Sequence, residues 1–269
     1  PEYAVVRTVL DKVDLAGPAR EAGLAYPDTV PATASALESW QGPVVVKCRT
    51  HWNPGQTRPH RIDARQFSSS AAAQPQVDLI TLAGGQPVLQ RPVQGDLGAL
   101  IGFMHEGRLR ARVQQETQRL WPTPNGMSAR AQTVPVDEPL ARRAENLLNR
   151  IGWHGLMELQ FLKDAAGKSH VIDANGRFYG SLALAERARP GLVDAWARTA
   201  VGERVGPLGD GRPGVRYSWC AGDVRRALIE RRRGLLADLG DTVFSGLGAQ
   251  HSVWDRLDPT PTWQLIRER

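Results

Sequence analysis

The sequence predicts an α+β protein, because hairpin patterns and an amphipathic helix follow one another along the chain. Residues 99–122 and 155–181 each read as two strands joined by a turn, with His105, Glu106 and Gly107 as the first turn. Residues 137–153 have helical spacing, with apolar side chains on one face and arginines on another. These three segments indicate a mixed fold of hairpins and helices.

The segments before the first hairpin carry two lysines. Residues 5–23 have helical spacing that includes Lys12, with Asp11 and Pro18 as interruptions. The run Val44-Val45-Val46 after Gly-Pro predicts a buried strand that ends in Lys47. Residues 50–76 are polar and small without a sustained period, so a long loop or lid is expected there.

The end of the chain is expected to be an extension. Residues 182–202 are helical in pattern, and a Gly/Pro-rich break at 202–214 marks a boundary. A strand, a basic helix and an irregular end are expected after it. The predicted organisation is an N-terminal subdomain at 1–85, a second subdomain at 86–205 and the extension at 206–269.

Composition indicates an ordinary globular protein. The chain has 269 residues, 41% apolar and 23% charged, and no apolar run approaches the roughly 18 residues that cross a bilayer. Cys48 and Cys220 lie far apart and form no metal-type spacing, so a reducing cytoplasm is expected. The chain begins at Pro1 in what reads as the middle of a domain, so we expect that an upstream segment is absent.

The basic charge leaves two interpretations open. A net charge of +6 and a pI near 9.8 indicate either an anionic partner or a coding bias, since most of the basic residues are arginine. No Lys/Arg stripe is interleaved with aromatic residues, which disfavours nucleic-acid binding. The arginine-rich helix expected at 223–236 is either a binding face or a solvated one.

The second hairpin carries oxygen ligands on one face. Strand alternation turns Glu158 away from Met157 and Leu159, and it places Asp173 and Asn175 on a common face. If the two strands pair, one face presents all three polar side chains. Hard oxygen donors suit Mg²⁺, and a cation would offset the repulsion between the carboxylates. The alternative is a solvated strand face.

Two kinds of basic residue favour a phosphate site beside that face. Arg177 continues the row two residues after Asn175 and could hold a phosphate oxygen. Lys12 and Lys47 precede the hairpin on a helix and a strand. Taken alone, Lys47 would be read as a surface lysine at the end of a strand.

In the order of these parts the chain resembles the ATP-grasp superfamily, in its branch of carboxylate-amine ligases and carbamoyl-phosphate-synthase-like enzymes. The resemblance spans residues 11 to about 202 and rests on the motifs DKVDLAGPAREAGLAYPDT (11–29), PVVVKC (43–48), VLQRPVQGD (88–96), GLMELQF (155–161) and VIDANGRFYGS (171–181). It implies two α+β subdomains that clamp ATP between antiparallel sheets. It also implies that a family domain upstream of residue 1 is not represented.

The resemblance implies a role for each candidate residue. The nucleotide ligands would be Lys12, Lys47, Gln90, Arg91, Pro92, Val93 and Asp96, with residues 89–93 as the hinge that reads adenine. The metal ligands would be Glu158, Asp173 and Asn175, which hold Mg²⁺ or, as an alternative, Mn²⁺. Arg177 and Arg119 would be the catalytic cations, and the lid at about 50–76 would close over the phosphates. For Arg119 the alternative is an exposed arginine in a surface turn. Residues 256–266 (RLDPTPTWQLI) resemble the last segment of some bacterial proteins of this family.

Three departures from the family pattern shape these expectations. Arg91 stands where the family commonly has Glu, and Asp173 is one methylene shorter than the usual Glu. The lid is bulkier and more basic, so Arg58 and Arg61 would grip phosphate.

The resemblance implies a two-step reaction on small molecules. A carboxylate would attack the γ-phosphorus of ATP to give an acyl phosphate, and an amine would then open it to an amide. The carboxylate and amine would come from an amino acid, a peptide or another small metabolite, with no membrane involved. A nucleotide-binding module that has lost turnover is the alternative reading.

Overall fold

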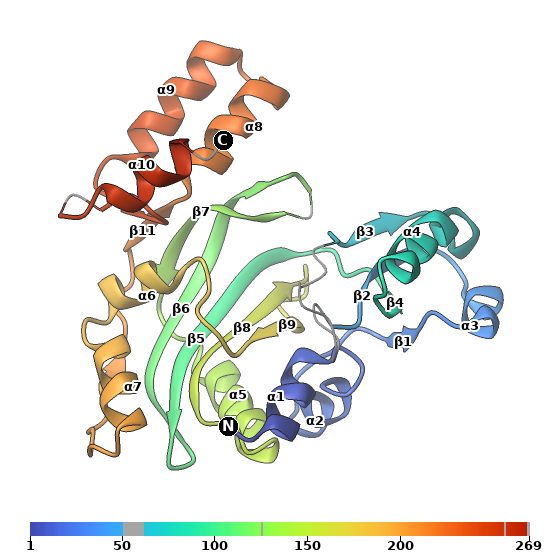
Figure 1. Ribbon diagram of the computed structural model, residues 1–269, viewed down its shortest axis with the longest axis horizontal. Helices are drawn as coiled ribbons and strands as arrows, with labels where there is room; N and C mark the ends of the chain where they lie inside the picture. The colour runs from blue at the N-terminus through green and yellow to red at the C-terminus, as the bar shows by residue number, and fades with distance from the viewer. Residues whose placement is uncertain (51–61, 125, 256, 268–269) are drawn as a thin grey trace. The chain divides into compact units, whose positions relative to one another are not determined.

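The computed structural model describes residues 1–50, 62–124, 126–255 and 257–267 and confirms the α+β class (Figure 1). The described residues form two compact units. Unit 1 comprises Pro1–Leu97, Met104–Leu109 and Asp137–Arg177, and unit 2 comprises Gly98–Phe103, Arg110–Val136 and Phe178–Arg269. The units therefore interleave in sequence, unlike the three consecutive segments expected. The reason is that β5 (Asp96–His105) and β6 (Arg108–Trp121) each contribute residues to both units.

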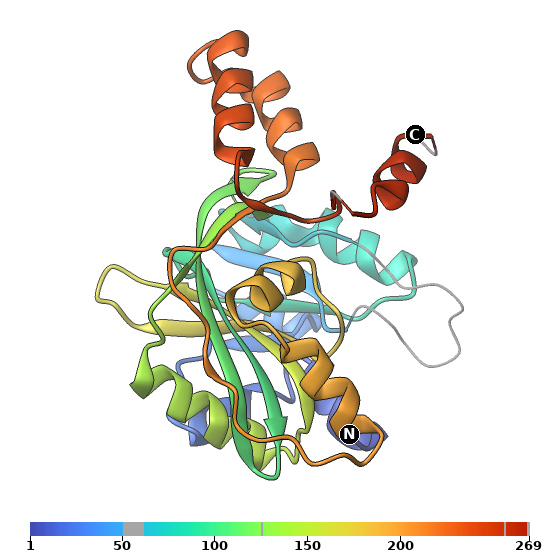
Figure 2. The same cartoon turned by 90° about the vertical axis from the view of Figure 1, so that its left-hand side faces the viewer.

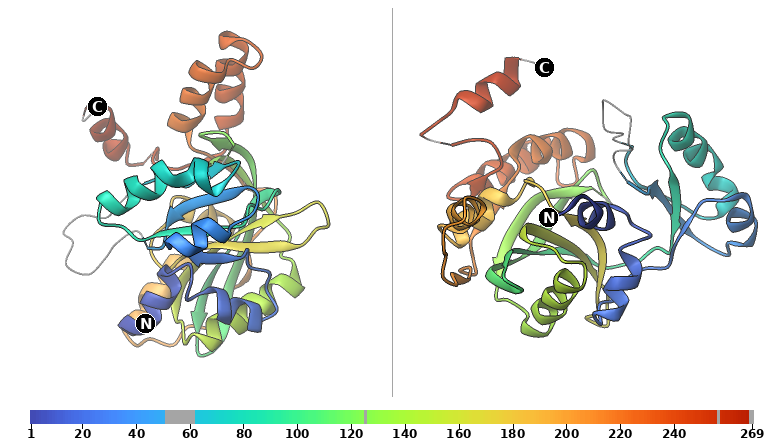
Figure 3. Two further views of the ribbon diagram at one scale, coloured as in Figure 1. Left: turned by 90° about the vertical axis from the view of Figure 1, so that its right-hand side faces the viewer. Right: turned by 60° about the horizontal axis from the view of Figure 1, so that its bottom comes forward.

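Unit 1 contains an antiparallel four-stranded sheet. Its strand order is β1 (Thr29–Pro31), β4 (Pro87–Gln90), β2 (Val44–Cys48) and β3 (Arg65–Phe67). The helices α3 (Ala34–Ser39) and α4 (Ser70–Leu82) belong to the same unit, and Figure 3 shows α4 lying along the sheet. Val44, Val46 and Cys48 of β2 pack with apolar residues of α4 in a buried cluster. The strand predicted at 44–47 is thus confirmed.

The expected loop at 50–76 is partly wrong, because its described end is regular. Residues 65–67 form β3, and α4 begins at Ser70 after Ser69, whose hydroxyl accepts the backbone N–H of Ala72. Buried side chains at Ala73, Val77 and Ile80 give the helix a core-facing row. Pro75 and the run of small residues hide this period in the sequence. The remaining part of the expected lid, including Arg58 and Arg61, lies outside the described residues.

Unit 1 also contains three helices and a hairpin. The helices are α1 (Tyr3–Leu10), α2 (Ala16–Glu21) and α5 (Glu138–Arg150), and the strands are β8 (Gly155–Lys163) and β9 (Ser169–Asn175). The predicted helix at 137–153 is confirmed as α5, which Asp137 caps by accepting the Leu140 N–H. The helix expected over 5–23 is instead two helices, because the Asp11 carboxylate accepts the N–H groups of Val13 and Asp14 and forms a turn.

Unit 2 is built on a second sheet. Its strands run in the order β12 (Gln250–His251), β11 (Arg216–Ser218), β7 (Met127–Val134), β6 and β5, and β10 (Gly209–Asp210) pairs with β6. The turn predicted between β5 and β6 is confirmed, since Glu106 and Gly107 both have positive φ angles. The helices of unit 2 are α6 (Leu182–Ala188), α7 (Leu192–Ala200), α8 (Cys220–Glu230), α9 (Leu235–Gly246) and α10 (Thr260–Arg267). Figure 2 shows α8 and α9 side by side as a helical pair.

Candidate nucleotide and metal site

One face of the β8–β9 hairpin in unit 1 carries the predicted metal ligands. Glu158 lies opposite Asn175 in the antiparallel register, and Gln160 lies opposite Asp173. Because opposed residues point to the same side of a sheet and alternate residues along a strand share a face, all four side chains lie together. The structure therefore brings Glu158, Asp173 and Asn175 onto one face, as the alternation predicts, and adds Gln160.

Hydrogen bonds organise this face around Glu158. The Glu158 side chain is buried, with 3% of the residue exposed. Its Oε2 accepts the Asn175 Nδ2–H at 2.8 Å and the Gln160 Nε2–H at 3.1 Å. A buried carboxylate with two amide donors is held in a defined orientation.

Lys12 reaches the same face from the turn between α1 and α2. Its Nζ lies 3.5 Å from Asp173 Oδ1, and the lysine side chain is 6% exposed while the aspartate side chain is 29% exposed. The Tyr26 hydroxyl donates to the Lys12 carbonyl at 2.8 Å, and burial raises the pKa of that hydroxyl, which keeps it a donor. Lys12 is thus fixed through its backbone while its ammonium group meets a carboxylate.

Lys47 contacts β9 at a β-bulge. Asp173 pairs with Gln160 and Val171 pairs with Phe161, so Ile172 is an extra residue in the ladder. The Lys47 Nζ donates to the Ile172 carbonyl at 3.1 Å. Burial and the nearby Lys12 charge lower the Lys47 pKa to about 7, while Asp173 opposes the shift. Lys12 and Lys47 therefore gather beside the carboxylates, as the phosphate-site hypothesis requires.

An ion pair that sequence reasoning missed ties the two lysine segments together. Asp11 Oδ2 accepts the Arg49 Nε–H at 2.6 Å, and the Lys12 N–H donates to the Arg49 carbonyl at 3.2 Å. Arg49 follows Lys47 by two residues, so this contact joins the turn that bears Lys12 to the end of β2. The available signal was an acidic residue inside an otherwise helical pattern, directly before Lys12.

The expected hinge lies at the end of β4 and beyond it. Gln90 is buried and donates to Thr29 Oγ1 at 2.7 Å, and the Arg91 N–H donates to the Asp28 carbonyl at 2.8 Å. Pro92 and Val93 are partly buried outside regular structure.

Arg91 itself turns toward the segment before β2. Its guanidinium donates to the Gln41 carbonyl at 2.6 Å and lies 4.3 Å from the centroid of the Trp40 ring. Asp96 is exposed at the start of β5. The Arg91 side chain is thereby held by residues 40–41.

The two predicted catalytic arginines fall in different units. Arg177 is exposed and ends the unit 1 segment that carries β9. Arg119 lies on β6 in unit 2, where its guanidinium donates to Asp223 Oδ1 and Asp241 Oδ2, each at 2.9 Å. These carboxylates hold Arg119 in an ion-pair cluster with the helices α8 and α9, and its catalytic role stays a prediction.

Glu158, Asp173 and Asn175 suit a magnesium ion only if phosphate oxygens of a nucleotide supply further ligands. Among the described residues, no group of three or more His, Cys, Asp or Glu side chains could hold a metal ion. Glu158 and Asp173 supply two carboxylates and Asn175 a carboxamide. Protein sites for Mg²⁺ commonly use one or two carboxylates together with substrate phosphates and water. The hairpin face matches that pattern rather than a metal cage made by protein alone.

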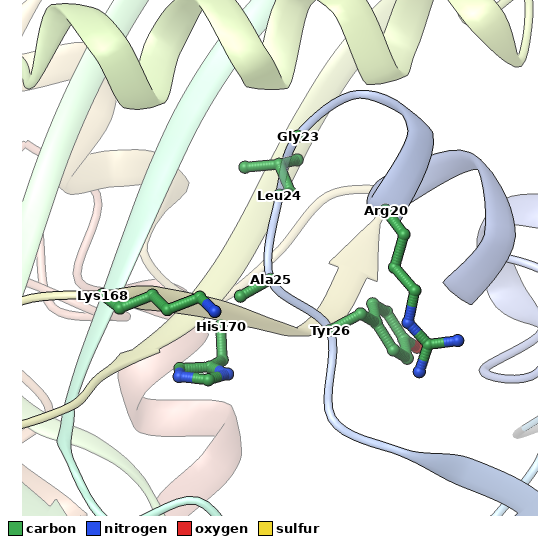
Figure 4. A pocket seen from close by; sticks show the side chains of 7 residues that line it. All are labelled: Arg20, Gly23, Leu24, Ala25, Tyr26, Lys168 and His170. Atoms are coloured by element: carbon green, nitrogen blue, oxygen red, sulfur yellow. The ribbon is translucent and has the colours of Figure 1, made fainter.

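A cavity of about 320 Å³ lies elsewhere in unit 1 (Figure 4). Its lining residues are Arg20, Gly23, Leu24, Ala25, Tyr26, Lys168 and His170. Arg20 pairs with Asp28 at 3.0 Å and the His170 ring contacts Asp164 at 2.8 Å, so two of its nitrogen-bearing side chains already have carboxylate partners. None of the lining residues is a predicted nucleotide or metal ligand, and the chemistry of the hairpin face identifies the candidate site better than this hollow does.

None of the described helices combines the length and apolar character that crossing a membrane requires.

Comparison with solved structures shows that the chain has the ATP-grasp fold, in agreement with the resemblance of its motifs. L-amino acid ligase from Bacillus licheniformis has a TM-score of 0.61 at 14% identity, over 75% of this chain and 50% of that chain. N5-carboxyaminoimidazole synthetase from Staphylococcus aureus, complexed with ADP, has a TM-score of 0.59 at 13% identity, over 80% and 57%. Biotin carboxylase from Campylobacter jejuni, in a complex with an ATP compound, has a TM-score of 0.59 at 14% identity, over 77% and 49%.

These similarities are structural. No protein-family model matches the sequence, and no curated protein matches it. The chain spans about half the length of the solved structures that it resembles.

Proposed function

We propose that this chain binds ATP with Mg²⁺ at the hairpin face of unit 1 and uses it to join a carboxylate to an amine. The observation that carries the proposal is the gathering of Glu158, Asp173 and Asn175 on one face, with Lys12 and Lys47 directed to β9. Carboxylates beside two buried lysine side chains suit a ligand that brings both a divalent cation and phosphate oxygens.

Each side chain has a role in this proposal. Glu158, Asp173 and Asn175 would hold Mg²⁺, which supplies charge neutralisation between the phosphates when it is bound. Lys12 and Lys47 would bind phosphate oxygens, with Lys47 protonated once the anion arrives. Arg177, which is exposed, would neutralise the transferred phosphoryl group. Residues 90–93 would contact the base.

The proposed reaction proceeds in two balanced steps. A carboxylate oxygen attacks the γ-phosphorus, the bond from that phosphorus to the β–γ bridging oxygen breaks, and ADP leaves as an acyl phosphate forms. An amine then attacks the acyl carbon, the carbon–oxygen bond to phosphate breaks, and the amine loses a proton to give the amide. The site would act by positioning and charge neutralisation, since phosphoryl transfer needs little other chemistry from the protein.

The solved structures support this class of reaction, but they do not identify the substrates of this chain. Two of the three described above are named as a ligase or a synthetase, and two are complexes with ADP or an ATP compound. At 13–14% identity we carry over only the class, a small-molecule carboxylate and an amine.

Hydroxylamine trapping tests carboxylate activation directly. The protein is incubated with Mg²⁺, ATP and hydroxylamine across a panel of amino acids, dipeptides and other carboxylates, and hydroxamate and ADP are both measured. We expect equal amounts of hydroxamate and ADP with at least one carboxylate, because hydroxylamine intercepts the acyl phosphate.

The alternative, a nucleotide-binding module without turnover, has one observation in its favour. Arg91 lies over Trp40 at the position where the family commonly has Glu, so the usual side-chain contact to the base is missing. ATP binding that requires Mg²⁺ but yields neither ADP nor hydroxamate with any carboxylate would favour that module over the ligase.

A further inference from the structure

Gln160 is the member of the hairpin face that has no assigned role. It lies on β8 between the buried Leu159 and Phe161, it is partly buried, and it opposes Asp173 across the ladder. With Glu158 on its own strand and Asp173 opposite it, Gln160 fills one corner of a two-by-two array whose other three corners are the proposed metal ligands.

The hydrogen bonds of the array fix how the amide of Gln160 lies. Its Nε2 donates to Glu158 Oε2 at 3.1 Å, and Asn175 Nδ2 donates to the same oxygen at 2.8 Å. Because Oε2 of Glu158 accepts both hydrogen bonds, each amide turns its nitrogen toward Glu158 and its oxygen away from it. Oε2 of Glu158 therefore accepts one hydrogen bond from Gln160 on its own strand and one from Asn175 on the opposite strand.

We propose that Gln160 is a positioning residue that holds the Glu158 carboxylate in the orientation needed to bind Mg²⁺ with the nucleotide. This inference rests on the proposed function. Glu158 has several rotatable bonds, and Asn175 alone would hold it from one side only. Groups that hydrogen-bond to a metal ligand orient that ligand, and their loss typically weakens metal affinity by about 10- to 100-fold. Gln160 acts through Glu158 and is not itself assigned as a ligand.

The test compares Gln160→Met, which keeps the length of the side chain but removes the donor, with the wild type. The measured quantity is the Mg²⁺ concentration that half-saturates ATP binding, followed by calorimetry. We expect Gln160→Met to raise this concentration at least about tenfold, and saturating Mg²⁺ to restore most of the ATP affinity. A purely structural role would change thermal stability without changing the Mg²⁺ requirement.

Gln74→Met is the matched control. Gln74 lies on α4 in the same unit and donates to Asp78 Oδ1 at 2.8 Å, so the change removes the same kind of bond away from the site. We expect it to leave the Mg²⁺ requirement unchanged. In a Glu158→Gln background, Gln160→Met should add little further effect, because its partner carboxylate is already gone.

An unchanged Mg²⁺ requirement in folded Gln160→Met would overturn the inference, and so would full additivity with Glu158→Gln. If Gln160→Met does not fold, Gln160→Asn replaces it. Its amide is one methylene shorter, so it too should raise the Mg²⁺ requirement, and an unchanged requirement would again count against the inference. Failure of the proposed function looks different, since the wild type itself would then bind ATP without any Mg²⁺ dependence.

Discussion

Lys47 is buried beside another lysine, and its charge state follows from that setting. Burial and Lys12 lower its pKa to about 7 from the ordinary 10.5, and the Ile172 carbonyl at 3.1 Å is its polar contact on β9. A phosphate anion placed beside it would favour the protonated form and raise that pKa again. ATP binding above pH 7 should therefore take up a proton.

The prediction is that ATP affinity in excess Mg²⁺ falls as pH rises from 7 to 9. The sign follows because the free protein must first bind the proton that its depressed pKa has released. Calorimetry at pH 8 in two buffers of different ionisation enthalpy should detect uptake of close to one proton. Lys47→Arg, which stays charged, should abolish the buffer dependence. Binding at pH 8 with no proton uptake in the wild type would contradict this account of Lys47.

Gly176 joins the proposed metal ligand Asn175 to Arg177 and leaves no room for a side chain. A Cβ at this position would lie 2.1 Å from Cη2 of the buried Trp153 ring. Gly176→Ala should cost about 1–3 kcal/mol of unfolding free energy, as overpacking of a core does. It should also weaken ATP binding, because the turn must shift Asn175 or Arg177.

Urea denaturation and ATP titration check this prediction. Gly17→Ala in α2 of the same unit is the control, since nothing lies within 4 Å of a Cβ there and alanine favours a helix. Trp153→Leu should restore part of the lost stability in the Gly176→Ala background by making space. If Gly176→Ala is as stable as the wild type, the packing argument is wrong.

Among the elements, α8 and α9 are fastened to β6 and β7 by buried charges. Asp223 is fully buried at the start of α8 and accepts hydrogen bonds from Arg119 on β6 and Arg130 on β7. Asp241 on α9 pairs with the same two arginines. These ion pairs link segments about a hundred residues apart in sequence.

We predict that Asp223→Ala destabilises unit 2 by about 3–5 kcal/mol, because Arg119 and Arg130 then keep only the Asp241 carboxylate and lose the fully buried one. Asp210→Ala is the comparison. Asp210 pairs with Arg112 at 2.6 Å in the same unit, but its side chain is 43% exposed, so the expected cost is below about 1 kcal/mol. Both variants are measured by chemical denaturation followed by circular dichroism. Equal effects of the two changes would refute the structural role assigned to Asp223.

The elements that the sequence predicted well are those whose pattern is local. Strand alternation placed Glu158, Asp173 and Asn175 on one face, and the observed register puts Glu158 directly opposite Asn175. The helix α5 followed from its amphipathic spacing. In both cases the information lies within about twenty residues.

Other features depended on contacts that a local pattern does not contain. Lys47 donates to the carbonyl of Ile172, which lies at a bulge, and a bulge has no marker in this sequence. The Asp11–Arg49 pair joins residues 38 apart, and Arg119 meets Asp223 104 residues further along. The polar reading of residues 62–76 failed because Pro75 and small residues masked a helical period.

For the chain as a whole, the order of the motifs predicted the fold better than the residues within each motif did. The ATP-grasp fold is shared with solved structures at only 13–14% identity, and no family model matches the sequence. The motif order predicted that fold, because the lysines, the hinge and the carboxylate hairpin follow one another along the chain in the order of the fold's elements. The substrates could not be predicted, because the walls of a binding pocket come from scattered side chains.

The central claim is that the β8–β9 hairpin seats a divalent ion against the phosphates of ATP. The most direct measurement is calorimetric titration of ATP into the wild type and into the double variant Asp173→Ala, Asn175→Ala, each with Mg²⁺ and with EDTA. We predict that the wild type binds ATP more tightly with Mg²⁺ and that the double variant loses this gain. A double variant whose Mg²⁺-dependent ATP affinity equals that of the wild type would contradict the claim.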